Sequence, residues 1–138
     1  MQPVKAINHI GIAVRSIEEQ RPFYESVLGA VFEGTEIVAD QKVKVGFFLI
    51  AGVRLELLEP TDPSSTVAAF IEKRGEGLHH VAYTVDDIQA RLEELKNEGV
   101  RLIDQIPRPG AHHTQIAFLH PKSSCGVLTE LCEPPAAH

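Results

Sequence analysis

Two histidines and two glutamates recur in the same order in the two halves of this 138-residue chain. His9 lies in INHIGIAV and Glu56 in RLELLEP, while His80 lies in LHHVAYTV and Glu130 in VLTELCEP. A carboxylate inside an apolar strand is costly to bury unless it is paired or bound to a cation. Two imidazoles and two carboxylates suit Zn, Co, Ni, Mn or Fe(II). The repeat therefore predicts one divalent ion shared by two similar halves, with coordination positions left for a chelating substrate.

The second half offers two adjacent histidines, and only one of them fits this site. Aligning NHIGIAV with HHVAYTV pairs His9 with His80 and not with His79. Neighbouring residues of a strand face opposite sides of a sheet, so one histidine of the pair points into the site. The repeat predicts that it is His80.

Simpler interpretations exist for each residue taken alone. A single strand histidine is usually a structural or surface residue, and a single strand glutamate usually faces solvent. The duplicated order of His and then Glu, at matching places in matching segments, favours the metal site over these interpretations.

The elements that must position these residues repeat as well. In the first half a strand over 6–14 precedes Ser16, which has the character of an N-cap. A helix follows with Gly29 at its end, and Ala51-Gly52 forms a plausible hairpin turn. Three further strands are expected over 30–38, 42–50 and 53–59.

A connector rich in Pro, Ser and Gly separates the halves, with a short helix expected over 66–74. The second half then repeats the plan. LHHVAYTV reads as a strand, Asp86-Asp87 caps the helix IQARLEELKNEG, and short strands are expected in VRLIDQ, TQIAFLH and GVLTELCE.

This order predicts an α+β fold of two tandem βαβββ modules that form a curled mixed sheet around the metal site. We expect a single domain over 1–138, with module one at about 5–60, the connector at about 61–77 and module two at about 78–134.

Composition narrows the class of protein. The net charge is −6, and the chain has no run of Lys or Arg, so binding to nucleic acid is not expected. No apolar stretch is long enough to span a bilayer, and no export segment is visible. We therefore expect a cytoplasmic protein without a membrane partner, whose Cys125 and Cys132 are thiols.

The motifs resemble the vicinal oxygen chelate superfamily, whose members pair βαβββ modules around one metal. Within it they resemble the methylmalonyl-CoA epimerases. The resemblance runs from about Ile7 to Leu131 and is carried by INHIGIAV, FYESVLGA, LELLEPT, SSTVAAFIEKRGEGLHHVAYTVDDI and GAHHTQIAFLHPKSSCGVLTEL. GLHHVAYTVDDI together with FLHPKSSCGVLTEL is specific to the epimerases, whereas the His and Glu ligands alone mark only the superfamily.

The resemblance implies a metal-dependent epimerase that interconverts (R)- and (S)-methylmalonyl-CoA. The α proton of this acyl-CoA would be removed and returned through a metal-stabilised enolate. The resemblance also places the metal ligands at His9, Glu56, His80 and Glu130. Some relatives carry Gln at the position of Glu56. Glu130 is the first choice for the base and Glu56 the second, because they flank the ion at pseudo-symmetric places. The family also suggests a homodimer.

The chain departs from the family pattern in one loop, where His113 replaces the usual Gly, Gln115 a frequent basic residue and Cys125 a common Gly. The candidates for contacts with the substrate are Lys122, His112 and His113. His120 is expected to hold the turn into the last strand. Three arginines are equally consistent with surface charge or with anion contacts: Arg54, Arg101 and Arg108.

Two alternatives keep the fold and change the function. A glyoxalase I-like lyase would use the same ligands and the same proton transfer on a thiol adduct of a 2-oxoaldehyde. A metal-free small-molecule binding protein of this superfamily would lack a full ligand set, whereas this chain has all four residues.

Overall fold

The computed structural model describes residues 1–136 and divides the chain into two compact units. The amino-terminal unit is His9–His79, and the carboxy-terminal unit comprises Met1–Asn8 and the chain from His80 onward. The boundaries fall inside two strands, β1 (Ala6–Ala13) and β5 (Gly77–Thr84). Each unit therefore contains one of the two predicted histidines, carried on one of these strands.

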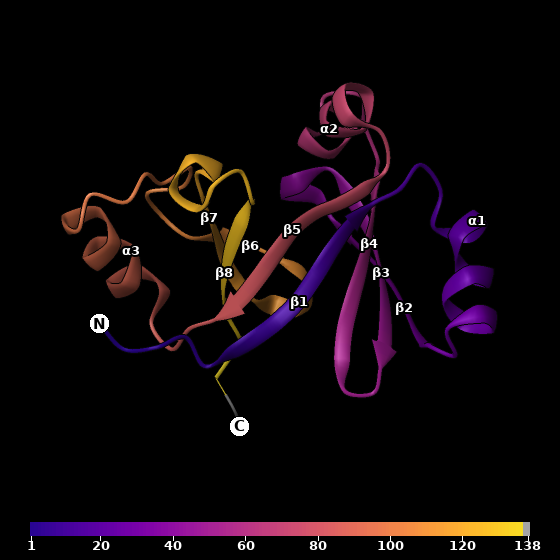
Figure 1. The fold of residues 1–138 in the computed structure, drawn as a ribbon, viewed down its shortest axis with the longest axis horizontal. Coiled ribbons are helices and arrows are strands. Elements are labelled where there is room, and N and C mark those ends of the chain that lie inside the picture. The colour runs from indigo at the N-terminus through magenta and orange to yellow at the C-terminus, as the bar shows by residue number, and fades with distance from the viewer. Residues whose placement is uncertain (137–138) are drawn as a thin grey trace. The chain divides into compact units, whose positions relative to one another are not determined.

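The amino-terminal unit contains a mixed four-stranded sheet in the order β2-β3-β4-β1. Its other strands are β2 (Val31–Val38), β3 (Val43–Ile50) and β4 (Val53–Pro60). β2, β3 and β4 are antiparallel neighbours, and β1 runs parallel to β4 (Figure 1). Ala51 and Gly52 both have positive φ, at 47° and 84°, which is the backbone of a tight hairpin turn between β3 and β4. The predicted strands and turn are confirmed.

One face of this sheet is covered by α1 (Ile17–Pro22), which continues as a π-helical turn, η1 (Phe23–Val27). Ser16 caps α1 by accepting a hydrogen bond from the Glu19 amide at 3.2 Å. The core beneath the helix is apolar and includes Ile17, Phe48 and Leu57, all of which are fully buried. This packing fixes the sheet so that the opposite face of each strand is available to the predicted site.

Two further helical segments belong to the same unit. η2 (Ala39–Gln41) links β2 to β3, and α2 (Thr66–Arg74) follows β4. Ser65 caps α2 by accepting the Val67 amide at 3.1 Å, so the helix expected in the connector is confirmed.

The carboxy-terminal unit repeats this plan with β5, α3 (Ile88–Asn97), β6 (Arg108–Pro109), β7 (Gln115–Leu119) and β8 (Thr129–Glu133). The sheet order is β5-β8-β7-β6, and β5 runs parallel to β8 while β6, β7 and β8 are antiparallel neighbours. Short 3-10 turns, η3 (Ala111–His113) and η4 (Pro121–Ser124), flank β7. Two βαβββ modules with mixed sheets are therefore present, as predicted.

The repeat extends to the way each helix is held. Asp87 caps α3 by accepting the Ala90 amide at 3.1 Å. The Ile88 amide donates to Glu133 at 2.9 Å, and in the other unit the Ile17 amide donates to Glu59 at 2.8 Å. In both units a carboxylate from the last strand therefore occupies the positive end of the helix.

The prediction of a strand in VRLIDQ is wrong. In that segment Leu102 forms only an isolated bridge with Leu119. The amides of Ile103 and Asp104 both donate to the carbonyl of Phe118, at 2.9 and 3.2 Å, so no regular ladder can continue. The second strand of the module is instead the two-residue β6, which ends at a proline that has no amide to donate.

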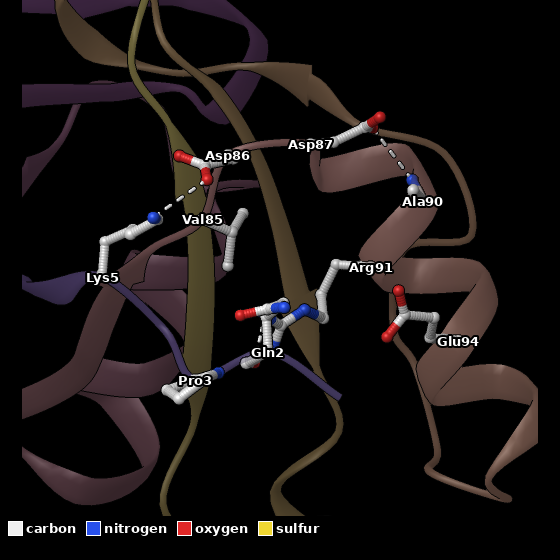
Figure 2. Close-up of a pocket in the computed structure, with 9 residues that line it drawn as sticks. All are labelled: Gln2, Pro3, Lys5, Val85, Asp86, Asp87, Ala90, Arg91 and Glu94. Atoms are coloured by element: carbon white, nitrogen blue, oxygen red, sulfur yellow. Dashed lines mark hydrogen bonds and ion pairs between the residues drawn. The ribbon is translucent and has the colours of Figure 1, made fainter.

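The first residues of the chain pack on the carboxy-terminal unit. The Lys5 amide donates to the carbonyl of Thr84 at 2.8 Å, the Lys5 ammonium lies 3.2 Å from the Asp86 carboxylate, and Arg91 donates to the carbonyl of Gln2 at 2.5 Å. Between this segment and α3 lies a pocket of about 370 Å³ (Figure 2). No residue of the predicted site lines this pocket.

Across residues 1–136, no helix is long and apolar enough to cross a membrane. Cys125 is an exposed free thiol and Cys132 a buried one.

Candidate metal site

His9 and Glu56 form the first of two buried pairs. Gly11, two residues after His9 in β1, lies opposite Glu56 of β4 in the parallel register. Strand alternation therefore places both side chains on the face that α1 does not cover. The Nδ1 atom of His9 lies 3.2 Å from Oε2 of Glu56, and the two residues are only 5% and 7% exposed.

Burial dominates the electrostatics of this pair. It lowers the pKa of His9 to about 4, and the positive charge of Arg54 adds to that shift. Burial also raises the pKa of Glu56 to about 7, an effect that Arg54 partly opposes and Glu36 reinforces. Near neutral pH the His9 imidazole is therefore neutral, and the Glu56 carboxyl group is about half ionised. The two side chains do not form an ion pair. A metal ion binds the neutral imidazole as it stands, and it binds the Glu56 carboxylate once the proton of that group is released.

His80 and Glu130 form the second pair, in the carboxy-terminal unit. Ala82, two residues after His80 in β5, lies opposite Glu130 of β8. The Nε2 atom of His80 lies 3.5 Å from Oε1 of Glu130, and the residues are 5% and 4% exposed. The ring of Phe118, the register partner of Glu130 on β7, packs edge-on against the His80 ring at 5.6 Å.

His79 points to the other side of β5 from His80. Its ring packs edge-on against Phe70 of α2, with the centroids 4.9 Å apart, and burial lowers the pKa of His79 to about 4. The structure thus gives the two adjacent histidines separate surroundings, aromatic for His79 and carboxylate for His80.

The geometry of the two pairs fits metal ligation. Donors bound to one ion at about 2.1 Å lie about 3.0 to 3.4 Å apart, depending on the coordination geometry. The nitrogen–oxygen separations within the pairs, 3.2 and 3.5 Å, agree with that spacing. Imidazole nitrogen and carboxylate oxygen are ligands of divalent transition metals, and binding such an ion offsets the cost of burying a carboxylate. The buried residues therefore fit a divalent metal ion.

The predicted substrate-contact residues lie in exposed turns. His112 and His113 belong to η3 and both have positive φ, at 55° and 60°. Lys122 lies in the exposed turn η4. Its amide donates to Nδ1 of His120 at 3.1 Å, which confirms that His120 holds this turn.

Two charged residues of the amino-terminal unit act on the site although sequence reasoning left one open and missed the other. Arg54 stands two residues before Glu56 on β4, and Glu36 of β2 raises the pKa of Glu56. For Arg54 the signal is its strand alternation with Glu56. Glu36 gives no sequence signal. The strand register places it opposite Val45 of β3, and Val45 lies two residues before Phe47, the register partner of Glu56.

Comparison with known proteins identifies the superfamily. A sequence model of the Glyoxalase/Bleomycin resistance protein/Dioxygenase superfamily matches residues 8–118. The chain therefore belongs to this superfamily, which is the class that the paired modules and the buried His and Glu residues indicate.

Its relatives include characterised enzymes and uncharacterised proteins. The uncharacterized protein YqjC of Bacillus subtilis is 49% identical over 93% of this chain and 91% of its own length. The ethylmalonyl-CoA/methylmalonyl-CoA epimerase of Cereibacter sphaeroides is 38% identical over 91% of this chain and 95% of its own. A methylmalonyl-CoA epimerase solved with methylmalonyl-CoA and NH4+ superposes with a TM-score of 0.91 at 36% identity, covering 97% of both chains. Within the superfamily, the chain belongs to the methylmalonyl-CoA epimerase family, and the predicted fold class is confirmed.

Proposed function

We propose that this protein is a metal-dependent epimerase that interconverts (R)- and (S)-methylmalonyl-CoA. The observation that carries the proposal is the pair of buried His–Glu contacts, one in each module, in a chain whose family members are named for this reaction. Nearly full-length coverage of a relative solved with methylmalonyl-CoA supports the choice of substrate.

His9, Glu56, His80 and Glu130 are proposed to hold one divalent ion. Its identity is open among Co, Zn, Ni, Mn and Fe(II), since all of them accept this mixture of nitrogen and oxygen ligands. When bound, such an ion supplies positive charge that favours the negative charge developing on a carbonyl oxygen during proton removal.

The proton transfers are assigned to the two glutamates. The α carbon of methylmalonyl-CoA lies between a thioester and a carboxylate, so breaking its C–H bond leaves the electron pair delocalised onto oxygen. We assign Glu130 as the first choice for the base, which takes the α proton on a carboxylate oxygen, and Glu56 as the second choice. The C–H bond forms again on the opposite face with a proton from the carboxylic acid so formed or from solvent. Both carboxylates are buried, which keeps bulk water from competing with them.

The test is exchange of the α proton with deuterated solvent. Wild-type protein loaded with Co²⁺ should incorporate deuterium into methylmalonyl-CoA, and Glu130→Gln should reduce that rate by about 10² or more, the usual contribution of a positioned base. Glu133→Gln is the matched control, since Glu133 lies on the same strand but accepts the Ile88 amide on the helix side. Undiminished exchange in Glu130→Gln would remove Glu130 from this role.

The same assay separates the epimerase from a lyase. A hemithioacetal of a 2-oxoaldehyde offered to the same preparation should not be converted. Conversion of that compound without turnover of methylmalonyl-CoA would replace the proposal with a glyoxalase I-like activity.

Three further assignments remain predictions. Lys122, His112 and His113 are proposed to contact the substrate, with Lys122 the candidate for a CoA phosphate, which their exposed turns permit. The homodimer and the cytoplasmic location follow from the family resemblance and from the composition, and each awaits its own measurement.

A further inference from the structure

Arg54 lies on the same sheet face as the proposed metal ligand Glu56. The two residues alternate on β4, which separates their Cα atoms by about 7 Å. The guanidinium carbon of Arg54 is 5.9 Å from the centre of the Phe47 ring, and Phe47 is the register partner of Glu56 on β3. The positive charge of Arg54 is therefore directed along the face of the site and away from the core beneath α1.

This guanidinium has few partners of its own. Its Nη2 atom lies 3.4 Å from Oε1 of Glu33, which is long for a charge-assisted hydrogen bond. Its Nε atom is buried and has no hydrogen-bond partner within residues 1–136. The side chain as a whole is 37% exposed, so its outer nitrogens can be reached by a ligand. An arginine has five N–H donors, and most of those of Arg54 remain available.

Arg21 of the same unit is an arginine whose guanidinium donors are largely used in hydrogen bonds to other side chains. Its Nε and Nη2 atoms donate to the two carboxylate oxygens of Glu25, at 2.8 and 3.3 Å, and its Nη1 atom donates to Glu18 at 3.4 Å. Its guanidinium also stacks on the Phe32 ring at 3.8 Å. Both arginines pair with a phenylalanine and with carboxylates, but only Arg54 stands on the site face with unused donors.

We propose that Arg54 receives the free carboxylate of the acyl group and thereby selects 2-carboxyacyl thioesters over uncharged ones. The inference rests on the proposed function and names the residue that recognises its substrate. A guanidinium presents paired N–H groups that match a carboxylate, and its contact with Glu33 is weak enough to be shared or displaced. Its place beside Glu56 puts it at the reacting acyl group rather than at the phosphates, which lie at the far end of the long CoA chain.

The experiment compares two ligands that differ in the carboxylate alone. Binding of methylmalonyl-CoA and of propionyl-CoA is measured by calorimetry on wild-type protein and on Arg54→Met, both loaded with Mn²⁺ to the same measured stoichiometry. Arg54→Met keeps much of the apolar stem over Phe47 and removes the charge. It should weaken methylmalonyl-CoA about tenfold or more, as expected for loss of a charged hydrogen-bond donor, and change propionyl-CoA less than about twofold. Arg54→Lys should recover part of the loss.

Arg21→Met is the matched control, and it should leave the dissociation constants of both ligands at the wild-type values. Equal weakening of both ligands by Arg54→Met would overturn the inference in favour of a contact with the CoA phosphates. Unchanged binding of both would overturn it in favour of a surface charge. A wild-type protein that does not prefer methylmalonyl-CoA would instead refute the proposed function, and the inference with it.

Discussion

Metal binding by this protein should depend on pH through one carboxyl group, that of Glu56. A metal ion binds the carboxylate and not the protonated carboxyl group, so binding must release any proton that Glu56 carries. Since burial raises the pKa of Glu56 to about 7, that proton is largely present below neutral pH. Burial lowers the pKa of its neighbour His9 to about 4, so the imidazole is already neutral throughout the range from pH 6 to pH 8.

The size of the effect follows from the Glu56 pKa. With a pKa of about 7, roughly one carboxyl in eleven is ionised at pH 6 and about ten in eleven at pH 8. The contribution of Glu56 to the apparent affinity should therefore rise about tenfold over this interval, or about 1.4 kcal/mol, and level off above it. The affinity of the protein for the metal ion should therefore increase as the pH rises from 6 to 8.

Calorimetric titration of the metal-free protein with Mn²⁺ at pH 6 and pH 8 measures this difference, and Glu56→Gln isolates it. An amide supplies a neutral oxygen ligand and has no proton to release. The pH dependence of log Kd in the variant should be shallower than in the wild type by about one unit over the interval. Titrations at pH 6 in buffers of different ionisation enthalpy count the protons released when the metal binds. The Glu56→Gln variant should release about one proton fewer than the wild type. Identical pH dependence in the two proteins would refute the reasoning, because Glu56 would then not be the titrating ligand.

Two other predictions concern a proposed metal ligand, His80, and a carboxylate that holds a helix start, Glu59. His80→Gln should abolish stoichiometric metal binding measured by elemental analysis, because His80 contacts Glu130. His79→Gln should retain the metal, because the His79 ring packs against Phe70. Retention of the metal in both variants would exclude His80 as a ligand. Glu59→Ala should lower the free energy of unfolding in urea by about 1–2 kcal/mol, because the Ile17 amide at the start of α1 loses its 2.8 Å charged partner. The exposed Glu72 of α2 provides the control, since Glu72→Ala should change the free energy of unfolding by less than about 0.5 kcal/mol. Equal losses of unfolding free energy in the two variants would show that Glu59 does not stabilise the start of α1.

The elements of this chain could be predicted well because their signals are local. Ser16 and Asp87 each mark a helix start by residue type, and each accepts the expected backbone amide in the structure. Ala51-Gly52 marks the hairpin in the same way, through a turn that needs positive φ at both residues. The segment VRLIDQ misled because its alternation is that of a strand, while its pairing depends on the distant Phe118 carbonyl, which accepts two successive amides.

Long-range register explains which parts of the site could be found from sequence. His9 and Glu56 were found because the second module repeats them, so the repeat replaced knowledge of the β1–β4 register. The position two residues before Glu130 is Leu128, and the arginine over Phe118, the register partner of Glu130, comes instead from Arg108 of β6. The repeat therefore gives no sequence signal for Arg54. Its surroundings depend on Glu33 of β2, and that contact is visible only once the strands are paired. A repeat thus reveals what two modules share, while the features that give one module its own specificity appear only in the folded chain.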